Sequence, residues 1–217
     1  MRRAAAALAG LIAWQAHAHG PTPAALPQFE PPAPGTYTLP PIQAAPDGEV
    51  LDLQGRARRL ADFTRGRLTL LGFVYTRCPD PDGCPRATWA FTAVRSLLRD
   101  RPALLPRVRF VTLSFDPAHD TPRRLADYAK RVGPPRSPEW HFVTTRSRAA
   151  LEPILEGFGQ DLRVAAGSKA RPGTEAFSHT LKVFLLDAAG QVREIYGTAY
   201  LAPEVIVNDL ETLALER

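Results

Sequence analysis

The run from Arg67 to Tyr75, RLTLLGFVY, is almost continuously apolar or β-branched. Such a run is typical of a strand buried on both faces, in a sheet that helices cover on both sides. It is followed by a helical pattern to about Asp100, a second apolar run from Arg107 to Phe115, and a helical pattern from Thr121 to Gly133. This order of strand, helix, strand and helix predicts an α/β fold in which the two strands pair in parallel.

Shorter patterns on both sides of this unit predict the rest of the fold. Alternating residues around Gln54-Gly55 predict an N-terminal β-hairpin over Glu49 to Leu60. Further along, the patterns predict a strand at Trp140 to Thr144, a helix from Ser147 to about Phe158, the strand QVREIYG and a closing helix from Pro203 to Leu215. The last hairpin and helix resemble the closing half of a thioredoxin-like fold. We therefore expect a central mixed sheet flanked by helices.

Residues 1–18 carry the pattern of an export signal. Arg2 and Arg3 precede the apolar stretch Ala4 to Trp14, and a small-x-small cleavage site ends at Ala18. The apolar stretch has eleven residues, well short of the roughly 20 that span a bilayer, and no later run is long enough. We therefore expect an exported, periplasmic protein that is soluble or loosely membrane-associated, with no transmembrane span in the mature chain.

The mature chain is predicted to consist of a tether and one domain. Nine prolines between His19 and Pro46 indicate a proline-rich tether over residues 19–38, which leaves residues 39–217 for the domain. With 45% hydrophobic and 23% charged residues, the composition is that of a globular domain with a substantial core. Loss of the signal removes two arginines and lowers the formal net charge from +5 to +3, which is 25 basic minus 22 acidic residues. The charged residues are spread along the chain, with no run of five or more like charges. Nucleic-acid binding is therefore not indicated.

The chain has two cysteines, Cys78 and Cys84, directly after the first buried strand in the stretch RCPDPDGCP. On a regular helix, six positions leave a net rotation of about 240°, so the two thiols would point apart. They can meet only if Pro79 to Gly83 forms a loop, and the turn sequence Pro81-Asp82-Gly83 favours that loop.

Three roles are open to this pair of thiols. A thiolate at the start of a helix is stabilised by the helix dipole and by nearby cations, here Arg77 and Arg86, which favours either metal binding or redox reactivity. The third role is a structural disulfide, although a bridge across so short a loop constrains little of the unfolded chain.

A histidine late in the chain is a further candidate. His179 lies 95 residues after Cys84 in a strand predicted from the alternation of Phe177, His179, Leu181, Val183 and Leu185. A histidine on such an apolar face is either a core residue or a metal ligand. The polar stretch from Arg163 to Glu175 that precedes it is predicted to be a mobile surface loop.

Two aspartates follow the second buried strand in SFDPAHDTP. Asp116 and Asp120 lie at the carboxyl end of that strand, where open α/β sheets gather functional groups. The alternative is a structural role, with Asp116 in a turn and either Asp120 or Thr121 as the cap of the following helix.

Three segments resemble the signature segments of the Sco/SenC family of copper chaperones, which share a thioredoxin-like fold. They are FVYTRCPDPDGCP, TLSFDPAHDTP and FSHTLKVFLLDAAGQV, in that order, and the resemblance spans about Leu39 to Leu215. It implies that Cys78, Cys84 and His179 bind copper. It also implies a structural or partner-docking role for the two aspartates. The chain departs from the family in having five residues between its cysteines, where three are usual.

The resemblance implies an exported chaperone that binds copper as Cu(I) or Cu(II). Two soft thiolates suit Cu(I), and an imidazole suits either oxidation state. The client would be a cuproprotein to which the chain delivers copper or whose thiols it prepares, such as the copper centre of cytochrome c oxidase in subunit II. The alternative is a thiol:disulfide oxidoreductase with Cys78 and Cys84 as its catalytic redox pair, which does not need His179 and tolerates the longer loop.

Overall fold

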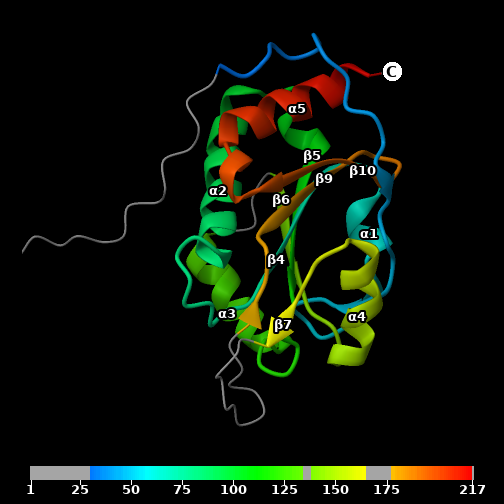
Figure 1. Cartoon of the computed structure of the whole chain (residues 1–217), viewed down its shortest axis with the longest axis vertical. Coiled ribbons are helices and arrows are strands. Elements are labelled where there is room, and N and C mark those ends of the chain that lie inside the picture. Colours follow the sequence, from blue (N-terminus) through cyan, green and yellow to red (C-terminus); the bar gives the residue numbers. More distant parts are fainter. Residues whose placement is uncertain (1–29, 134–137, 165–176, 217) are drawn as a thin grey trace, which may run out of the picture.

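The computed structural model describes residues 30–133, 138–164 and 177–216. Its centre is a six-stranded sheet in the order β1-β10-β9-β4-β5-β6 (Figure 1). The strands are β1 Gln43–Ala44, β4 Leu68–Val74, β5 Val108–Ser114, β6 Glu139–Val143, β9 Lys182–Leu186 and β10 Gln191–Gly197. β4, β5 and β6 pair in parallel, while β9 runs antiparallel to both β4 and β10. The predicted mixed sheet is confirmed.

Helices cover both faces of this sheet. The helices are α1 Ala61–Thr64, α2 Cys84–Leu97, α3 Pro122–Val132, α4 Arg148–Gly157 and α5 Pro203–Leu215, with 3₁₀ turns at Leu98–Asp100, Leu105–Arg107 and Thr198–Tyr200. α2, α3 and α5 pack on one face, and α1 and α4 pack on the other (Figure 1). Along β4, Leu70 faces the first layer and Leu71 the second. All seven residues of β4 are buried, which explains why nearly all of them are apolar or β-branched.

The local signals in the sequence mark most boundaries correctly. The predicted hairpin consists of β2 Glu49–Leu51 and β3 Ala57–Arg59, and Gly55 supplies the positive φ of 75° that its turn requires. Ser147 caps α4 by accepting a hydrogen bond from the Ala150 N–H, as expected.

The prediction of one continuous strand over Phe177 to Leu185 is wrong. β8, Phe177–Ser178, pairs with β7, Arg163–Val164, in a separate ribbon, and β9 begins only at Lys182. Between them the Thr180 carbonyl accepts a hydrogen bond from the Gln160 side chain at 2.9 Å. The alternation of apolar and polar residues continues through this break. Such alternation indicates which face of an extended segment is buried, but it does not indicate which strand the segment pairs with. Of the predicted surface loop, residues 165–175 lie outside the described part.

The first described residues lie along α5. The Tyr37 hydroxyl donates a hydrogen bond to Asp209 at 2.6 Å, and the Asn208 side chain donates one to the Pro32 carbonyl at 3.0 Å. These contacts begin within the stretch predicted as a tether, so the domain boundary at residue 39 stays a prediction. The predicted signal peptide, residues 1–18, lies outside the described residues. No helix in the described part of the chain is long and apolar enough to cross a bilayer.

Candidate metal centre

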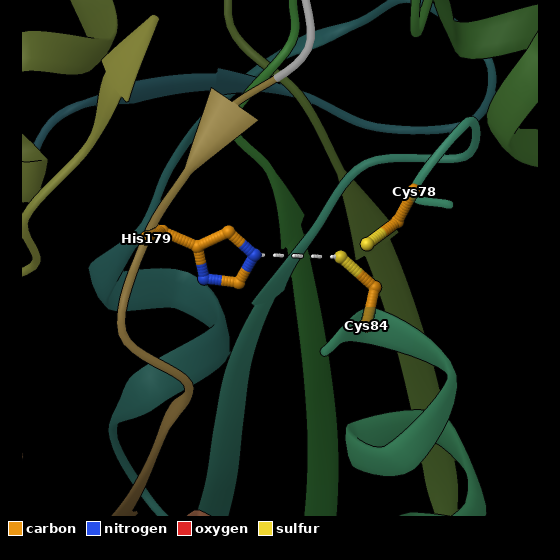
Figure 2. A group of neighbouring side chains, drawn as sticks. All are labelled: Cys78, Cys84 and His179. Carbon is orange, nitrogen blue, oxygen red and sulfur yellow. Dashed lines mark hydrogen bonds between the residues drawn. The ribbon is translucent and has the colours of Figure 1, made fainter. Parts of the chain in front are cut away.

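Three side chains from different parts of the chain meet at the carboxyl end of β4. Cys78 lies in the loop after β4, Cys84 is the first residue of α2, and His179 lies between β8 and β9. Their donor atoms all lie within 4.8 Å of one another, and the Cys84 Sγ is 3.8 Å from the His179 Nε2. Figure 2 shows the imidazole directed at the Cys84 sulfur, with the Cys78 sulfur next to it. Sequence position alone could not show this convergence.

The loop between the cysteines forms as its turn residues predict. The Cys78 N–H donates to the Tyr75 carbonyl at 3.1 Å, and the Gly83 N–H donates to the Asp80 carbonyl at 3.1 Å. These two turns bring Cys78 back over the start of α2. Both cysteines are free thiols, Cys84 buried and Cys78 half-buried.

The pKa values of the two cysteines are shifted in opposite directions. A hydrogen bond from the Cys84 thiol lowers the pKa of Cys78 to about 4, against the effect of burial, and a hydrogen bond with His179 acts in the same direction. The same hydrogen bond between the sulfurs, together with burial, raises the pKa of Cys84 well above its ordinary value. Cys78 is therefore the thiolate and Cys84 the thiol of a coupled pair.

The arginines beside the cysteines form ion pairs with aspartates. The Arg77 guanidinium pairs with the buried Asp116 carboxylate at 2.6 Å, and Arg86 pairs with Asp82 at 3.2 Å. The largest influences on the pKa of Cys78 are hydrogen bonds and burial. Arg77 and Arg86 are thus each paired with a carboxylate, and stabilisation of the thiolate by these two arginines stays a prediction.

The two aspartates support the loop. Asp120 is fully buried and accepts hydrogen bonds from the Thr76 N–H, the Thr76 hydroxyl and the Ser114 hydroxyl. The cap of α3 is Thr121, whose hydroxyl accepts from the Arg124 N–H. Asp116 and Asp120 do not belong to the group of donor atoms around Cys78. Their contacts are structural, which matches the role that the resemblance implies for them.

Two aromatic rings lie next to the imidazole. The Phe115 ring lies 4.7 Å from the His179 ring, nearly edge-on, and the Tyr75 ring lies 6.5 Å away. Phe177 packs against Tyr75 at 5.3 Å. Sequence reasoning missed this group, although Tyr75 and Phe115 both directly follow buried strands. The rings restrict how far the imidazole can turn.

The donor set fits a soft metal ion. Two sulfurs and one imidazole nitrogen are ligands that Cu(I) accepts in low coordination numbers, and these three lie close enough to share one ion. The assignment of Cys78, Cys84 and His179 as metal ligands stays a prediction.

The model of the SCO1/SenC family matches residues 43–215 of this chain. The chain belongs to the SCO1/SenC family. Among curated SCO1/SenC relatives, the mitochondrial SCO2 homolog of Mus musculus is 28% identical over 162 residues, which cover 74% of this chain. This chain spans only 58% of the length of the mouse protein.

Solved structures of SCO1/SenC proteins have the same thioredoxin-like fold. Apo Sco1 from Thermus thermophilus is 28% identical, with a TM-score of 0.65 over 82% of this chain and 95% of that chain. Arabidopsis thaliana ScoI, solved with copper bound, has a TM-score of 0.67 over 80% of this chain and 99% of that chain. At 16% identity, the Arabidopsis structure shows the likeness in fold alone.

Proposed function

We propose that this SCO1/SenC-family protein is an exported copper-binding chaperone. It holds copper at Cys78, Cys84 and His179, and it delivers the ion to, or prepares the thiols of, a cuproprotein such as the copper centre of cytochrome c oxidase, in subunit II. The observation that carries this proposal is the approach of two free thiols and one imidazole to within 4.8 Å of one another. Support for copper comes from the chemistry of these donors and from a family neighbour solved with copper bound.

The unequal burial of the two sulfurs suits a carrier whose metal is cargo. Cys84 is held within the protein, where the Tyr75 N–H donates to its sulfur at 3.4 Å. Cys78 is half-buried, so its sulfur is the ligand that a client can reach. Transfer would begin when a client ligand replaces Cys78 on the ion, and it would end when Cys84 and His179 release it.

Export to the periplasm is part of the proposal. It is supported by the basic start and short apolar stretch of residues 1–18, which have the order of regions found in export signals. In that compartment the thiols would meet both metal ions and oxidants. The chain could therefore load copper where an oxidase presents its copper centre.

Copper titration of reduced protein tests the three-ligand site. Under anaerobic competition with a Cu(I) chelator, His179→Ala should bind Cu(I) at least tenfold more weakly than wild type, because one of three donors is lost. His141→Ala is the matched control: His141 is also partly buried but packs on Phe63 and contacts Glu139. Equal affinity of His179→Ala and wild type would show that the imidazole does not bind the ion.

A second function is supported by the acidic thiol. With its pKa lowered to about 4, Cys78 is a thiolate that can attack a disulfide of a client protein. The attack forms a mixed disulfide and releases one client thiol. Cys84 then displaces the second, leaving a Cys78–Cys84 disulfide and a reduced client. Rapid multiple turnover of a protein disulfide with glutathione and without copper would favour this oxidoreductase over the chaperone.

A further inference from the structure

The carboxyl ends of β4 and β5 lie side by side directly under the cysteine loop. Val74, the last residue of β4, pairs in register with Ser114, the last residue of β5. The Phe115 N–H then donates to the Val74 carbonyl at 3.0 Å, which continues the pairing by one residue. Beyond this point the backbone hydrogen bonds between the two segments end. Hydrogen bonds that involve side chains then connect the residues after β4 with those of β5 and the segment after it.

Asp120 connects these two segments through three hydrogen bonds. Its carboxylate accepts from the Thr76 N–H at 3.0 Å and from the Thr76 hydroxyl, and it accepts from the Ser114 hydroxyl at 2.7 Å. A buried carboxylate is costly unless hydrogen bonds satisfy it. Here two of the donors belong to Thr76, two residues after β4, and the third belongs to Ser114, the last residue of β5. Asp120 therefore fixes Thr76 in place two residues before Cys78.

A second aspartate holds the next residue of the loop. The Asp116 carboxylate pairs with Arg77 at 2.6 Å, and the Asp116 N–H donates to the Ser114 hydroxyl at 3.1 Å. Thr76 and Arg77 are thus each held by one aspartate from the segment after β5. Cys78 is the next residue, and its N–H donates a hydrogen bond to the Tyr75 carbonyl.

We infer that Asp120 is a positioning residue for Cys78: it acts through Thr76 to hold the Cys78 sulfur against Cys84 and His179. It is not a metal ligand, because its carboxylate is occupied by Thr76 and Ser114. The importance of this position for copper rests on the proposed function. The positioning itself is a property of the metal-free protein.

A disulfide equilibrium measures the positioning without metal. Formation of a Cys78–Cys84 disulfide depends on how closely the fold holds the two sulfurs, because the bond tolerates little variation in geometry. In a glutathione redox buffer, Asp120→Asn should lower the equilibrium constant for disulfide formation about tenfold, or about 30 mV. The amide cannot accept from all the donors that the carboxylate satisfies, so the start of the loop becomes mobile.

Asp209→Asn is the matched control for loss of a buried carboxylate. Asp209 is also buried and accepts hydrogen bonds from two hydroxyls, those of Tyr37 and Tyr196, each at 2.6 Å. Asp209→Asn should lower the melting temperature but leave the disulfide equilibrium within about twofold of wild type. Equal effects of the two aspartate variants on that equilibrium would overturn the inference, because only general destabilisation would then be seen.

Thr76→Val keeps the test valid if Asp120→Asn does not fold. It removes the hydroxyl donor to Asp120 and keeps the shape of the side chain, and it should lower the same equilibrium constant about threefold. An unchanged constant in Thr76→Val and in any folded Asp120→Asn would overturn the inference. A wild-type protein that binds no copper would refute the proposed function alone, because the disulfide equilibrium does not involve metal.

Discussion

The two sulfurs of the site differ in exposure and in charge. Cys84 is buried at the start of α2 and keeps the shared proton, while Cys78 is half-buried and carries the negative charge. A thiolate is both the nucleophile and the metal ligand, so Cys78 can react or bind first without losing a proton. Cys84 must release its proton when a metal ion binds both sulfurs, which makes copper loading dependent on pH.

Alkylation should show this difference directly. The depressed pKa of Cys78 means that its thiolate persists above about pH 4 and is lost only as the pH falls through that value. In reduced protein, iodoacetamide should modify Cys78 before Cys84, at a rate that changes little between about pH 6 and about pH 8. An ordinary thiol would gain nearly tenfold per pH unit over most of that range. Mass mapping of peptides over a pH series gives both rates.

The Cys84→Ala variant provides the control for that measurement. It removes the thiol whose hydrogen bond has the largest effect on the pKa of Cys78. The alkylation rate of Cys78 should then rise more steeply with pH. A flat profile in Cys84→Ala would show that the charge on Cys78 has another cause.

Gly83 allows the two halves of the loop to come close together. A Cβ at this position would lie 3.3 Å from the Cys78 Sγ and 3.4 Å from the Asp80 carbonyl oxygen. Gly83→Ala should therefore displace the Cys78 sulfur and weaken Cu(I) binding roughly tenfold. The free energy of unfolding should change by only about 1 kcal/mol, because residues 79–82 before the buried Gly83 are exposed and can shift to relieve the contact.

Gly197→Ala is the corresponding control in β10. A Cβ there would meet no atom within 4 Å among the described residues. Its Cu(I) affinity, measured by the same chelator competition, should equal that of wild type. If Gly83→Ala also bound copper as wild type does, the tight approach of Cys78 to Gly83 would have no bearing on the site.

Much of the site could be predicted from the sequence where its determinants are local. The cysteine loop follows from Pro81-Asp82-Gly83, because turn preferences depend on adjacent residues. The partner of Arg77 could not be predicted in this way, because Asp116 is 39 positions away and only the pairing of β4 with β5 brings them together. The resemblance to the Sco/SenC family, not the spacing, brought His179 into the predicted site.

The segment that carries His179 depends on α4 for its position. Gln160, just beyond the end of α4, is buried and donates from its side-chain amide to the Thr180 carbonyl at 2.9 Å. This contact replaces the strand pairing that the sequence pattern predicted for residues 179–181. The alternation of apolar and polar residues does not reveal a hydrogen bond from a glutamine elsewhere in the chain. This explains why the strand was predicted as continuous.

Gln160→Ala should loosen His179 without touching any of the three donor atoms. Amide hydrogen exchange of residues 179–182 should become faster, and Cu(I) affinity should fall several-fold, because binding must then order the segment. Gln43→Ala is a suitable control, since the Gln43 amide also donates to a main-chain carbonyl, that of Gly157, but at the surface. Slower or unchanged exchange in Gln160→Ala would contradict this role for Gln160.

The whole sheet determines which parts of the chain reach the site. β4 is a central strand: it pairs in parallel with β5, which carries the supporting aspartates, and antiparallel with β9, which follows His179. The parallel half was predictable from its apolar runs and intervening helix. The packing of residues 32–37 on α5 was not, because prolines indicate extended chain but not whether it contacts a helix.

A metal ion at this site would join parts of the chain that are far apart in sequence. Cys84 and His179 are 95 residues apart, so an ion bound to both closes a long loop that the unfolded chain leaves open. A ligand that binds only the folded state, at a free concentration about 100 times its Kd, adds about 2.7 kcal/mol of stability. For a domain of this size, Cu(I) should raise the melting temperature of reduced wild type by roughly 5–10 °C.

His179→Ala separates closure of this loop from binding to the cysteines alone. At the same total Cu(I), its melting temperature should rise much less, because the two cysteines are close in sequence and can also bind copper in the unfolded chain. Differential scanning calorimetry under anaerobic conditions measures both shifts, and a strong Cu(I) chelator should reverse them. Equal shifts in wild type and His179→Ala would mean that copper does not connect the two halves of the fold, and that Cys78 and Cys84 alone would hold the ion.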